Sequence, residues 1–529
     1  MPDLYQELIN LADSDVYPFH MPGHKRNLES TPMKGAFRCD ITEIDGFDNL
    51  HDSNGILLKA QQRANELYSA EVTFFLINGS TCGVLSAVSA VMEEGGTILA
   101  ARGSHRSFYN AAYLRHINIK YLPYKMDNKY RIPVGYTASD IEEMLTDDIQ
   151  AVFITSPTYE GKISDIKGIA KACHSHGVPL IVDAAHGAHF VLSKHFKDNS
   201  FAKECCEQWK EDVNIAVENN NILYTTIPED AIQQGADIVI HSVHKTLPSM
   251  TQTALLHVQG EFVNYNKIRR FLSIYQSSSP SYVMMSSIDL CIREIENNGK
   301  EFASRLLKYR NMIAIGTAKC RYIEVVGKND IPDAAKILIS VNNAAMTGHE
   351  LYDILREEYK LQLEMAGDSY ALAIISGWDR REGIVRLIDA INAIDARIEI
   401  DNGYFDYDNN ANNDQPLDYT GSADGRLKDS MPASKLNQEF SDIVISMLPE
   451  RINPLYEAWD AEAELVGLDH AIGRISGGFI NLYPPGIPLI VPGERFSKTL
   501  IEDIEKYQQE GLSVQGVADR KEVLCVRQK

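Results

Sequence analysis

Short apolar runs alternate with helical patterns between about residues 51 and 290, which we assign to one large domain. The first pair is a strand pattern at Val72–Ile77, followed by apolar residues at helical spacing over Cys82–Met92. Such an alternation predicts an α/β fold with a mostly parallel sheet and helices on both faces. The same pattern predicts strands at 97–100, 119–122, 151–155, 179–182 and 237–240, and helices at 106–116 and 166–176.

The other segments predict four further units. Residues 1–50 are expected to form an N-terminal arm, with turn formers and cations gathered at His20–Arg26. Residues 291–400 are expected to form a smaller α/β domain, and residues 432–529 a C-terminal α+β domain with rigid Pro-Gly turns. Residues 401–431 are rich in Asn and Asp and poor in aliphatic residues, which predicts an acidic flexible linker or loop. Strand candidates in the smaller domain lie at 336–339 and 372–375.

Two predicted strands end in residues that carry chemistry. Asp183 follows the strand at 179–182, and Ser242-Val-His-Lys245 follows the strand at 237–240. Open α/β sheets bind ligands at the carboxyl ends of their strands. A lysine there can form an imine with the aldehyde of pyridoxal phosphate, and an aspartate can keep the pyridine nitrogen protonated. Lys245 alone would be interpreted as a surface lysine, but its pairing with Asp183 predicts a pyridoxal-phosphate site.

A turn between the first strand and its helix is suited to bind a phosphate. It reads Asn78-Gly-Ser-Thr-Cys-Gly83, and the hydroxyls of Ser80 and Thr81 can bind a phosphate beside the free amides of the helix. A simple helix cap is the alternative, and the turn lacks the lysine of a nucleotide-binding P-loop. Ser242 and His244, just before the lysine, are candidates for the same phosphate.

Three further positions belong to the same predicted edge of the sheet. His105, after the strand at 97–100, is placed to cover a cofactor ring, although it could also be a structural hydrogen-bonder. Thr158 lies in a turn after the strand at 151–155 and could reach a cofactor oxygen, or simply form part of a βα turn. Pairs of histidines three residues apart suggest zinc, but no carboxylate or cysteine completes a set, so no metal is expected. These pairs are His186 with His189 and His241 with His244.

Six motifs, in order along the chain, together resemble the bacterial ornithine/lysine/arginine decarboxylase family, in its shorter branch without an N-terminal receiver-like domain. They are His20-Met-Pro-Gly-His-Lys25, Gly79-Ser-Thr-Cys82, Ser156-Pro-Thr-Tyr159, Asp183-Ala-Ala-His-Gly-Ala-His189, Ser242-Val-His-Lys245 and Tyr483-Pro-Pro-Gly-Ile-Pro488. The resemblance implies a fold type I pyridoxal-phosphate enzyme that decarboxylates arginine, lysine or ornithine to the corresponding amine, and that works as a homodimer or higher homo-oligomer with shared sites.

The resemblance also implies roles for individual residues. Lys245 would carry the cofactor, Asp183 would face the pyridine nitrogen and His105 would stack on the ring. Further implied positions are the phosphate ligands Ser80, Thr81 and Ser242, His186 beside the phenolic oxygen, and His244 directly before the lysine.

Two alternatives remain open at this stage. Asp183 and Lys245 alone do not exclude an aminotransferase or a β-eliminating lyase of the same fold. In aminotransferases an arginine usually binds the substrate carboxylate, and Arg380, Arg381 and Arg474 are the candidates for that role here. A cofactor-binding regulatory protein without turnover is the other alternative. The distal cation of a basic substrate needs an acid, for which Glu364 and Glu494 are candidates.

Charge and composition narrow the class of partner and the location. The formal net charge is -22 and the pI about 5.1, which argues against a nucleic-acid surface. No apolar run approaches the roughly 20 residues of a membrane span. The eight cysteines are scattered, and the N-terminus lacks a signal-peptide core, so a cytoplasmic protein is expected.

Overall fold

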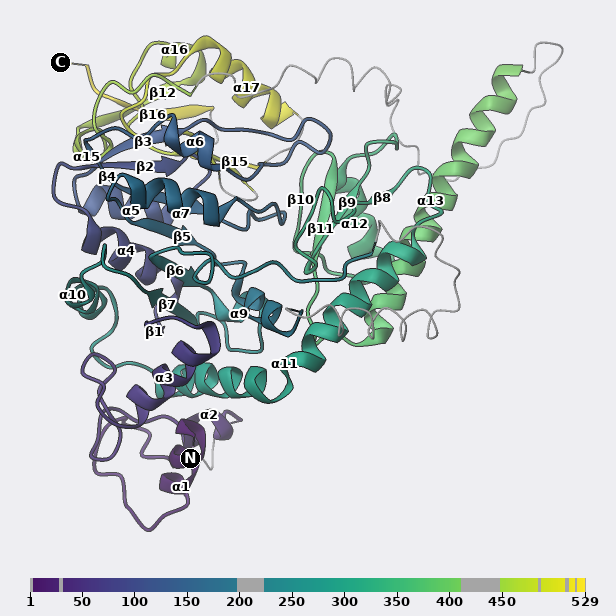
Figure 1. The fold of residues 1–529 in the computed structure, drawn as a ribbon. Coiled ribbons are helices and arrows are strands. Elements are labelled where there is room, and N and C mark those ends of the chain that lie inside the picture. Colours follow the sequence, from purple (N-terminus) through teal and green to yellow (C-terminus); the bar gives the residue numbers. More distant parts are fainter. Residues whose placement is uncertain are drawn as a thin grey trace.

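The computed structural model describes residues 3–27, 32–196, 223–410, 448–483, 487–509, 513–518 and 521–528. Its centre is a seven-stranded sheet in the order β1-β7-β6-β5-β4-β2-β3 (Figure 1). Neighbouring strands from β6 to β3 are parallel, whereas β7 runs antiparallel to β6 and to β1. The strands are β1 (Val72–Leu76), β2 (Thr97–Ala101), β3 (Asn118–Leu122), β4 (Ile149–Thr155), β5 (Leu180–Asp183), β6 (Ile238–His241) and β7 (Ala254–Val258).

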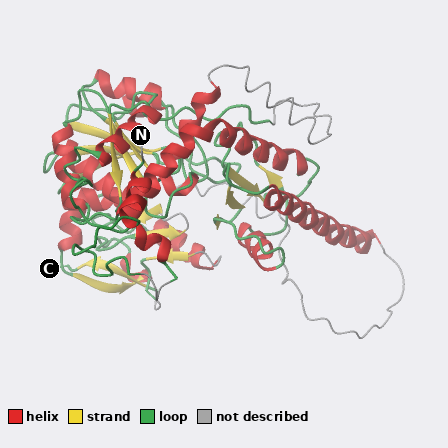
Figure 2. Ribbon diagram, turned by 90° about the horizontal axis from the view of Figure 1, so that it is seen from below, coloured by secondary structure: helices red, strands yellow, loops and turns green. Residues whose placement is uncertain are grey.

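Both faces of this sheet are buried, as the sequence predicted for a doubly covered sheet. In β5, Ile181 packs into one apolar cluster while its neighbours Leu180 and Val182 pack into the other. Helices α4, α5 and α10 supply the first cluster, and α3, α7 and α11 supply the second. These helices are α3 (Ile56–Tyr68), α4 (Gly79–Val91), α5 (Arg106–Leu114), α7 (Ile166–Ser175), α10 (Tyr265–Tyr275) and α11 (Tyr282–Gly316). Figure 2 shows them around the strands.

A second, antiparallel sheet lies beside the large one, in the order β10-β11-β9-β8 (Figure 1). Two of its strands confirm the patterns at 336–339 and 372–375. Helix α11 connects the two sheets and passes straight through the predicted domain boundary at residue 290. The elements of this region are β8 (Glu324–Val325), β9 (Lys336–Ser340), α12 (Gly348–Glu357), β10 (Met365–Ala366), β11 (Tyr370–Ile374) and α13 (Arg381–Asn410).

The linker predicted at 401–431 begins too early. Helix α13 continues to Asn410, so the first ten positions of that segment are helical. Asn, Asp and Gly are poor helix formers, but extending an existing helix costs far less than starting one. Residues 411–431 lie outside the described residues.

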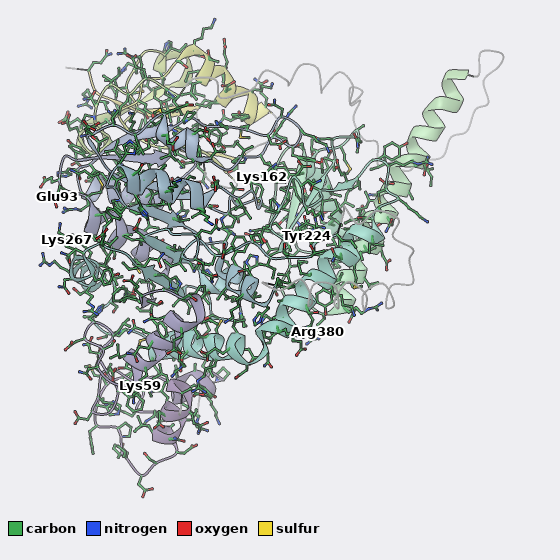
Figure 3. The ribbon with its side chains drawn as sticks, viewed as in Figure 1. Lys59, Glu93, Lys162, Tyr224, Lys267 and Arg380 are labelled. Atoms are coloured by element: carbon green, nitrogen blue, oxygen red, sulfur yellow. The ribbon has the colours of Figure 1, made fainter. Side chains whose placement is uncertain are left out.

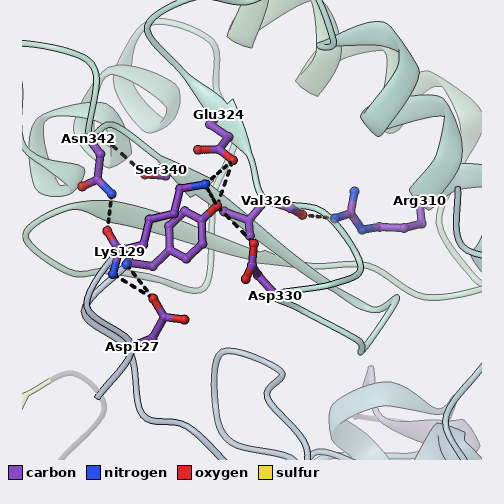
Figure 4. A network of polar contacts seen from close by, with 9 residues as sticks. Asp127, Lys129, Arg310, Glu324, Val326, Asp330, Ser340 and Asn342 are labelled. Carbon is purple, nitrogen blue, oxygen red and sulfur yellow. Dashed lines mark hydrogen bonds and ion pairs between the residues drawn. The ribbon is translucent and has the colours of Figure 1, made fainter. Parts of the chain in front are cut away.

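Polar contacts join the loop after β3 to the second sheet (Figure 4). The ammonium of Lys129 lies 3.1 Å from Glu324 of β8. The amide of Asn342 donates to the carbonyl oxygen of Lys129. Tyr130 and Ile132 pack in one apolar cluster with Leu338 and other residues of the second sheet. The second sheet is therefore held at a defined position against the large domain.

The C-terminal region packs near the β3 edge of the large sheet (Figure 1). A bidentate ion pair joins the two parts: Nη1 and Nη2 of Arg102 lie 2.7 and 2.8 Å from the carboxylate oxygens of Glu494, and both side chains are buried. The elements are α15 (Leu455–Asp460), β12 (Ala463–Gly467), α16 (Leu468–Ala471), β13 (Ile480–Tyr483), β14 (Ile487–Ile490), α17 (Lys498–Gln509), β15 (Ser513–Gln515) and β16 (Glu522–Val526).

The N-terminal arm contains α1 (Leu4–Ala12) and α2 (Lys34–Arg38). The backbone N–H of Leu4 donates to Asp289 of α11 over 2.9 Å, which ties the start of the arm to the body. Farther along, the arm presents large apolar side chains to solvent: Tyr17 is 68% exposed, Phe19 89% and Met21 66%.

Candidate active site

The carboxyl ends of β4, β5 and β6 lie side by side, because Thr155 pairs with Asp183, and Asp183 pairs with Ile240. Asp183 is the last residue of β5 and is only 4% exposed. Its Oδ1 accepts a hydrogen bond of 3.1 Å from the backbone N–H of Ala185. The parallel register therefore brings a fixed, buried carboxylate to the predicted edge of the sheet.

Lys245 lies on the short helix α9 (Val243–Thr246), directly after β6. Its Nζ is 3.0 Å from Nε2 of His186, and the side chain is exposed toward the pocket. Partial desolvation lowers the pKa of Lys245, against the opposing charges of Asp183 and Glu364. A lowered pKa raises the fraction of neutral amine, which is the form that attacks an aldehyde.

One pocket gathers most of the predicted site. His105 caps α5, where its Nδ1 accepts from the backbone N–H of Ser107 over 3.2 Å. Burial lowers the pKa of His105, although Asp183 opposes this effect, so the ring is neutral at pH 7. Six predicted residues line the pocket: Ser80, His105, Thr158, Asp183, His186 and Lys245.

Three predicted residues lie beside the pocket without lining it. Thr81 is exposed in the first turn of α4. Ser242 is fully buried at the start of α9. His244 lies next to Lys245, and its Nδ1 is 2.9 Å from the carbonyl oxygen of Thr253, so Nδ1 carries the proton and donates.

The model for the major domain of the Orn/Lys/Arg decarboxylases matches residues 2–219 and 215–364, and the model for their C-terminal domain matches residues 435–513. The chain belongs to this family. It is therefore a decarboxylase of basic amino acids, as the six sequence motifs predicted.

Known proteins align with this decarboxylase over nearly its whole length. It is 27% identical to the arginine decarboxylase of Bacillus subtilis (strain 168), over 98% of this chain and 95% of the relative. It is 21% identical to the lysine decarboxylase LdcA of Pseudomonas aeruginosa, over 94% of this chain and 74% of that longer protein. The match to the crystal structure of the Francisella novicida lysine decarboxylase LdcF covers 99% of this chain and 81% of the LdcF chain, with a TM-score of 0.74 and 16% identity. That likeness confirms the expected fold type I architecture.

The residues around the pocket of this decarboxylase fit a phosphorylated pyridine. Thr155 lines the pocket, and its buried hydroxyl has no hydrogen-bond partner among the described residues. The buried hydroxyls of Ser242 and Thr246, on either side of Lys245 in the sequence, have none there either. Unpartnered buried hydroxyls are costly, and a ligand with acceptor oxygens in the pocket would satisfy that of Thr155. Helix α4 begins at Gly79, where φ is +77°, and its free amides lie at the same edge.

Two pocket-related residues were not identified from the sequence. Glu160 lines the pocket and is 1% exposed, and burial raises the pKa of its carboxyl. Lys336 begins β9 with a fully buried side chain, and its Nζ lies 2.8 Å from Nδ1 of His186. A lysine at the head of the apolar run Lys336-Ile-Leu-Ile was a usable signal, because lysine is almost never fully buried without a partner.

The structure also decides between the other residues that were candidates for binding the substrate. Both carboxylate oxygens of Glu494 are bound to Arg102, so Glu494 is a structural acid and cannot bind a substrate cation. Glu364 accepts a hydrogen bond from Tyr159, which lines the pocket. Arg474 binds Glu464 over 2.7 Å in the C-terminal region. None of the described residues forms a group of His, Cys, Asp and Glu that could hold a metal.

Proposed function

We propose that this decarboxylase carries pyridoxal phosphate on Lys245 and acts on L-arginine. The carrying observation is the placement of Lys245 and Asp183 in one pocket at adjacent strand ends. When bound, pyridoxal phosphate supplies the electron sink that accepts the electrons of the bond to the departing carboxylate.

The residues of this chain would perform the other tasks. Lys245 would hold the cofactor and, once released, return a proton to the substrate carbon. Asp183 would keep the proton on the pyridine nitrogen, and His105 would cover the ring. Ser80 and the amides at the start of α4 would bind the phosphate, together with Ser242.

Two carboxylates favour a cationic substrate side chain in this pocket. Glu160 lines the pocket, and its Oε2 is buried without a hydrogen-bond partner among the described residues. Glu364 reaches the pocket through its hydrogen bond with Tyr159. Arginine is favoured over lysine by the more similar relatives: the Bacillus arginine decarboxylases match 93–98% of this chain at 25–27% identity. The lysine decarboxylases match at 21%, as does the biodegradative arginine decarboxylase of Escherichia coli.

Product analysis with three substrates tests this proposal. Purified protein is given arginine, lysine and ornithine separately, and carbon dioxide, amine and keto acid are quantified. We expect carbon dioxide and agmatine from arginine, with a kcat/KM at least about tenfold higher than for lysine, because a site that pairs with a guanidinium rejects a shorter ammonium. Preference for lysine or ornithine would overturn the substrate assignment. A keto acid without carbon dioxide would support the aminotransferase alternative instead.

A homodimer with shared sites is the second part of the proposal. The exposed Tyr17, Phe19 and Met21 make the arm a surface that a second copy could cover. A cytoplasmic location remains a prediction; within the described part of the chain, no helix has the length and apolar character of a membrane span.

Hybrid dimers test the shared site. Chains with Lys245→Ala are mixed with chains carrying His20→Ala and Lys25→Ala in the arm. If the arm completes the neighbour's site, each parent is inactive, while a hybrid holds one wholly wild-type site. Random pairing should then restore about a quarter of wild-type activity. Native mass spectrometry confirms that hybrids form. Hybrids without activity, or a fully active monomer in sedimentation at the assay concentration, would contradict the shared site.

A further inference from the structure

Lys336 begins β9 of the second sheet and contacts His186 of the pocket lining, with none of its own surface exposed. The loop that follows Glu160 packs against its stem. A Cβ atom at Gly161 would lie 2.8 Å from Cγ of Lys336, and Gly161 has a φ of +103°. Lys162, the next residue, is labelled in Figure 3 between the large domain and the second sheet. A glycine at position 161 therefore leaves room for the side chain of Lys336, which enters from the second sheet.

Lys336 is connected to Lys245 through a single histidine. Nζ of Lys336 is 2.8 Å from Nδ1 of His186, and Nε2 of His186 is 3.0 Å from Nζ of Lys245. Burial, together with the charges of Lys336 and Lys245, holds the pKa of His186 well below its usual range. The imidazole is therefore neutral and carries one proton. One of the two lysines must donate to the ring, and the other must accept from it.

The surroundings of Lys336 favour it as the donor. It faces the carboxylates of Asp333, Glu160 and Glu364, with Lys245 as the opposing charge. Asp333 is itself fixed, because its Oδ1 lies 2.8 Å from Nε2 of His189 and accepts from the backbone N–H of Ala335 over 2.9 Å. Burial lowers the pKa of Lys336 to about 8, which leaves it mostly protonated at pH 7.

We propose that Lys336 is a positioning residue that donates to Nδ1 of His186 and thereby directs the Nε2–H of His186 toward Lys245 and the pocket. Whenever its amine is free, before the cofactor binds or once it has been released, Lys245 accepts this hydrogen bond with its lone pair, which is possible only for the neutral amine. The second sheet would in this way determine the tautomer of a ring in the large domain. The role at Lys245 rests on the proposed cofactor function, whereas the tautomer of His186 does not.

Nitrogen NMR of the full-length chain tests the tautomer directly. The protein is labelled with ¹⁵N-histidine, and the His186 signals are assigned by their loss in His186→Gln. We expect wild-type His186 to carry its proton on Nε2. In Lys336→Met, which keeps the length of the side chain but removes the donor, we expect Nδ1–H to appear. Lys162→Met is the matched control, since Lys162 lies in the neighbouring loop and binds Asp127 over 2.9 Å.

Two results would overturn the proposal: a proton on Nδ1 of His186 in the wild type, or an unchanged tautomer in a folded Lys336→Met protein. The wild-type spectrum decides the first point even if Lys336→Met does not fold. Lys336→Arg provides a rescue, because it keeps a permanently charged donor and should preserve Nε2–H.

Kinetics separate positioning from simple support of the fold. Residues that orient a ligand through another group typically contribute 10–100-fold, so Lys336→Met should lower kcat by roughly that factor with little change in KM. If the effect passes through His186, adding Lys336→Met to His186→Gln should cause no further loss. Fully additive losses would contradict the proposal. If the wild type decarboxylates nothing, the proposed function fails, but the NMR result still decides the role of Lys336.

Discussion

We expect Lys245→Ala to lower decarboxylation by about 10⁴-fold or more and to abolish the visible absorption band of lysine-bound pyridoxal phosphate. Alanine has no amine to bond the cofactor or to return a proton. The side chain of Lys245 faces the pocket and contacts His186 there, so the protein should still fold without it. Absorbance and amine production are measured after dialysis.

Lys267→Ala serves as the control for this variant. Lys267 binds Glu93 over 2.9 Å at the far edge of the large domain, where Figure 3 labels both residues. An exposed ion pair contributes about 1 kcal/mol or less, so this variant should keep both band and activity. A Lys245→Ala protein whose band persists, and whose cofactor is fixed by borohydride to another lysine, would show that the assignment is wrong.

The sequence predicted those parts of the site that follow from local chain geometry. Asp183 ends one buried strand and Lys245 follows the next, and adjacent parallel strands end at the same edge, so their proximity needed no knowledge of the rest of the fold. The helices and strands of the large domain were predictable for the same reason, because the apolar pattern that predicts each element lies within its own stretch of sequence.

Contacts between distant segments could not be predicted in this way. Glu494 was a sequence candidate for binding the substrate cation, but its partner Arg102 lies 392 residues earlier in the chain. The sequence pattern predicts Lys336 only as the polar start of a strand, and the packing of the second sheet reveals its contact with His186. The start of the linker predicted at 401–431 was also misplaced, because the composition of one segment does not report how far a neighbouring helix extends.

Asp183→Asn is expected to keep the cofactor but to lower kcat by about 10²–10³-fold. The amide oxygen can still accept from the backbone N–H of Ala185, so the side chain should stay in place. The amide carries no charge, however, and cannot hold a proton on the pyridine nitrogen, so the ring becomes a poor electron acceptor. The measurement combines kcat with cofactor content, both determined on the same preparation.

Asp237→Asn provides a matched control at the opposite end of the same strands. Asp237 is also buried, and its Oδ2 accepts from the backbone N–H of Leu180 over 2.8 Å and lies 2.9 Å from Nε2 of His174. Burial raises the pKa of the Asp237 carboxyl, so loss of its charge should change the free energy of unfolding little. It should also leave kcat unchanged, because Asp237 lies at the amino ends of the strands and does not line the pocket. If Asp183→Asn retained near wild-type kcat, the buried carboxylate would not serve the cofactor. If both variants lost kcat equally, the loss would reflect damage to the sheet rather than the chemistry of Asp183.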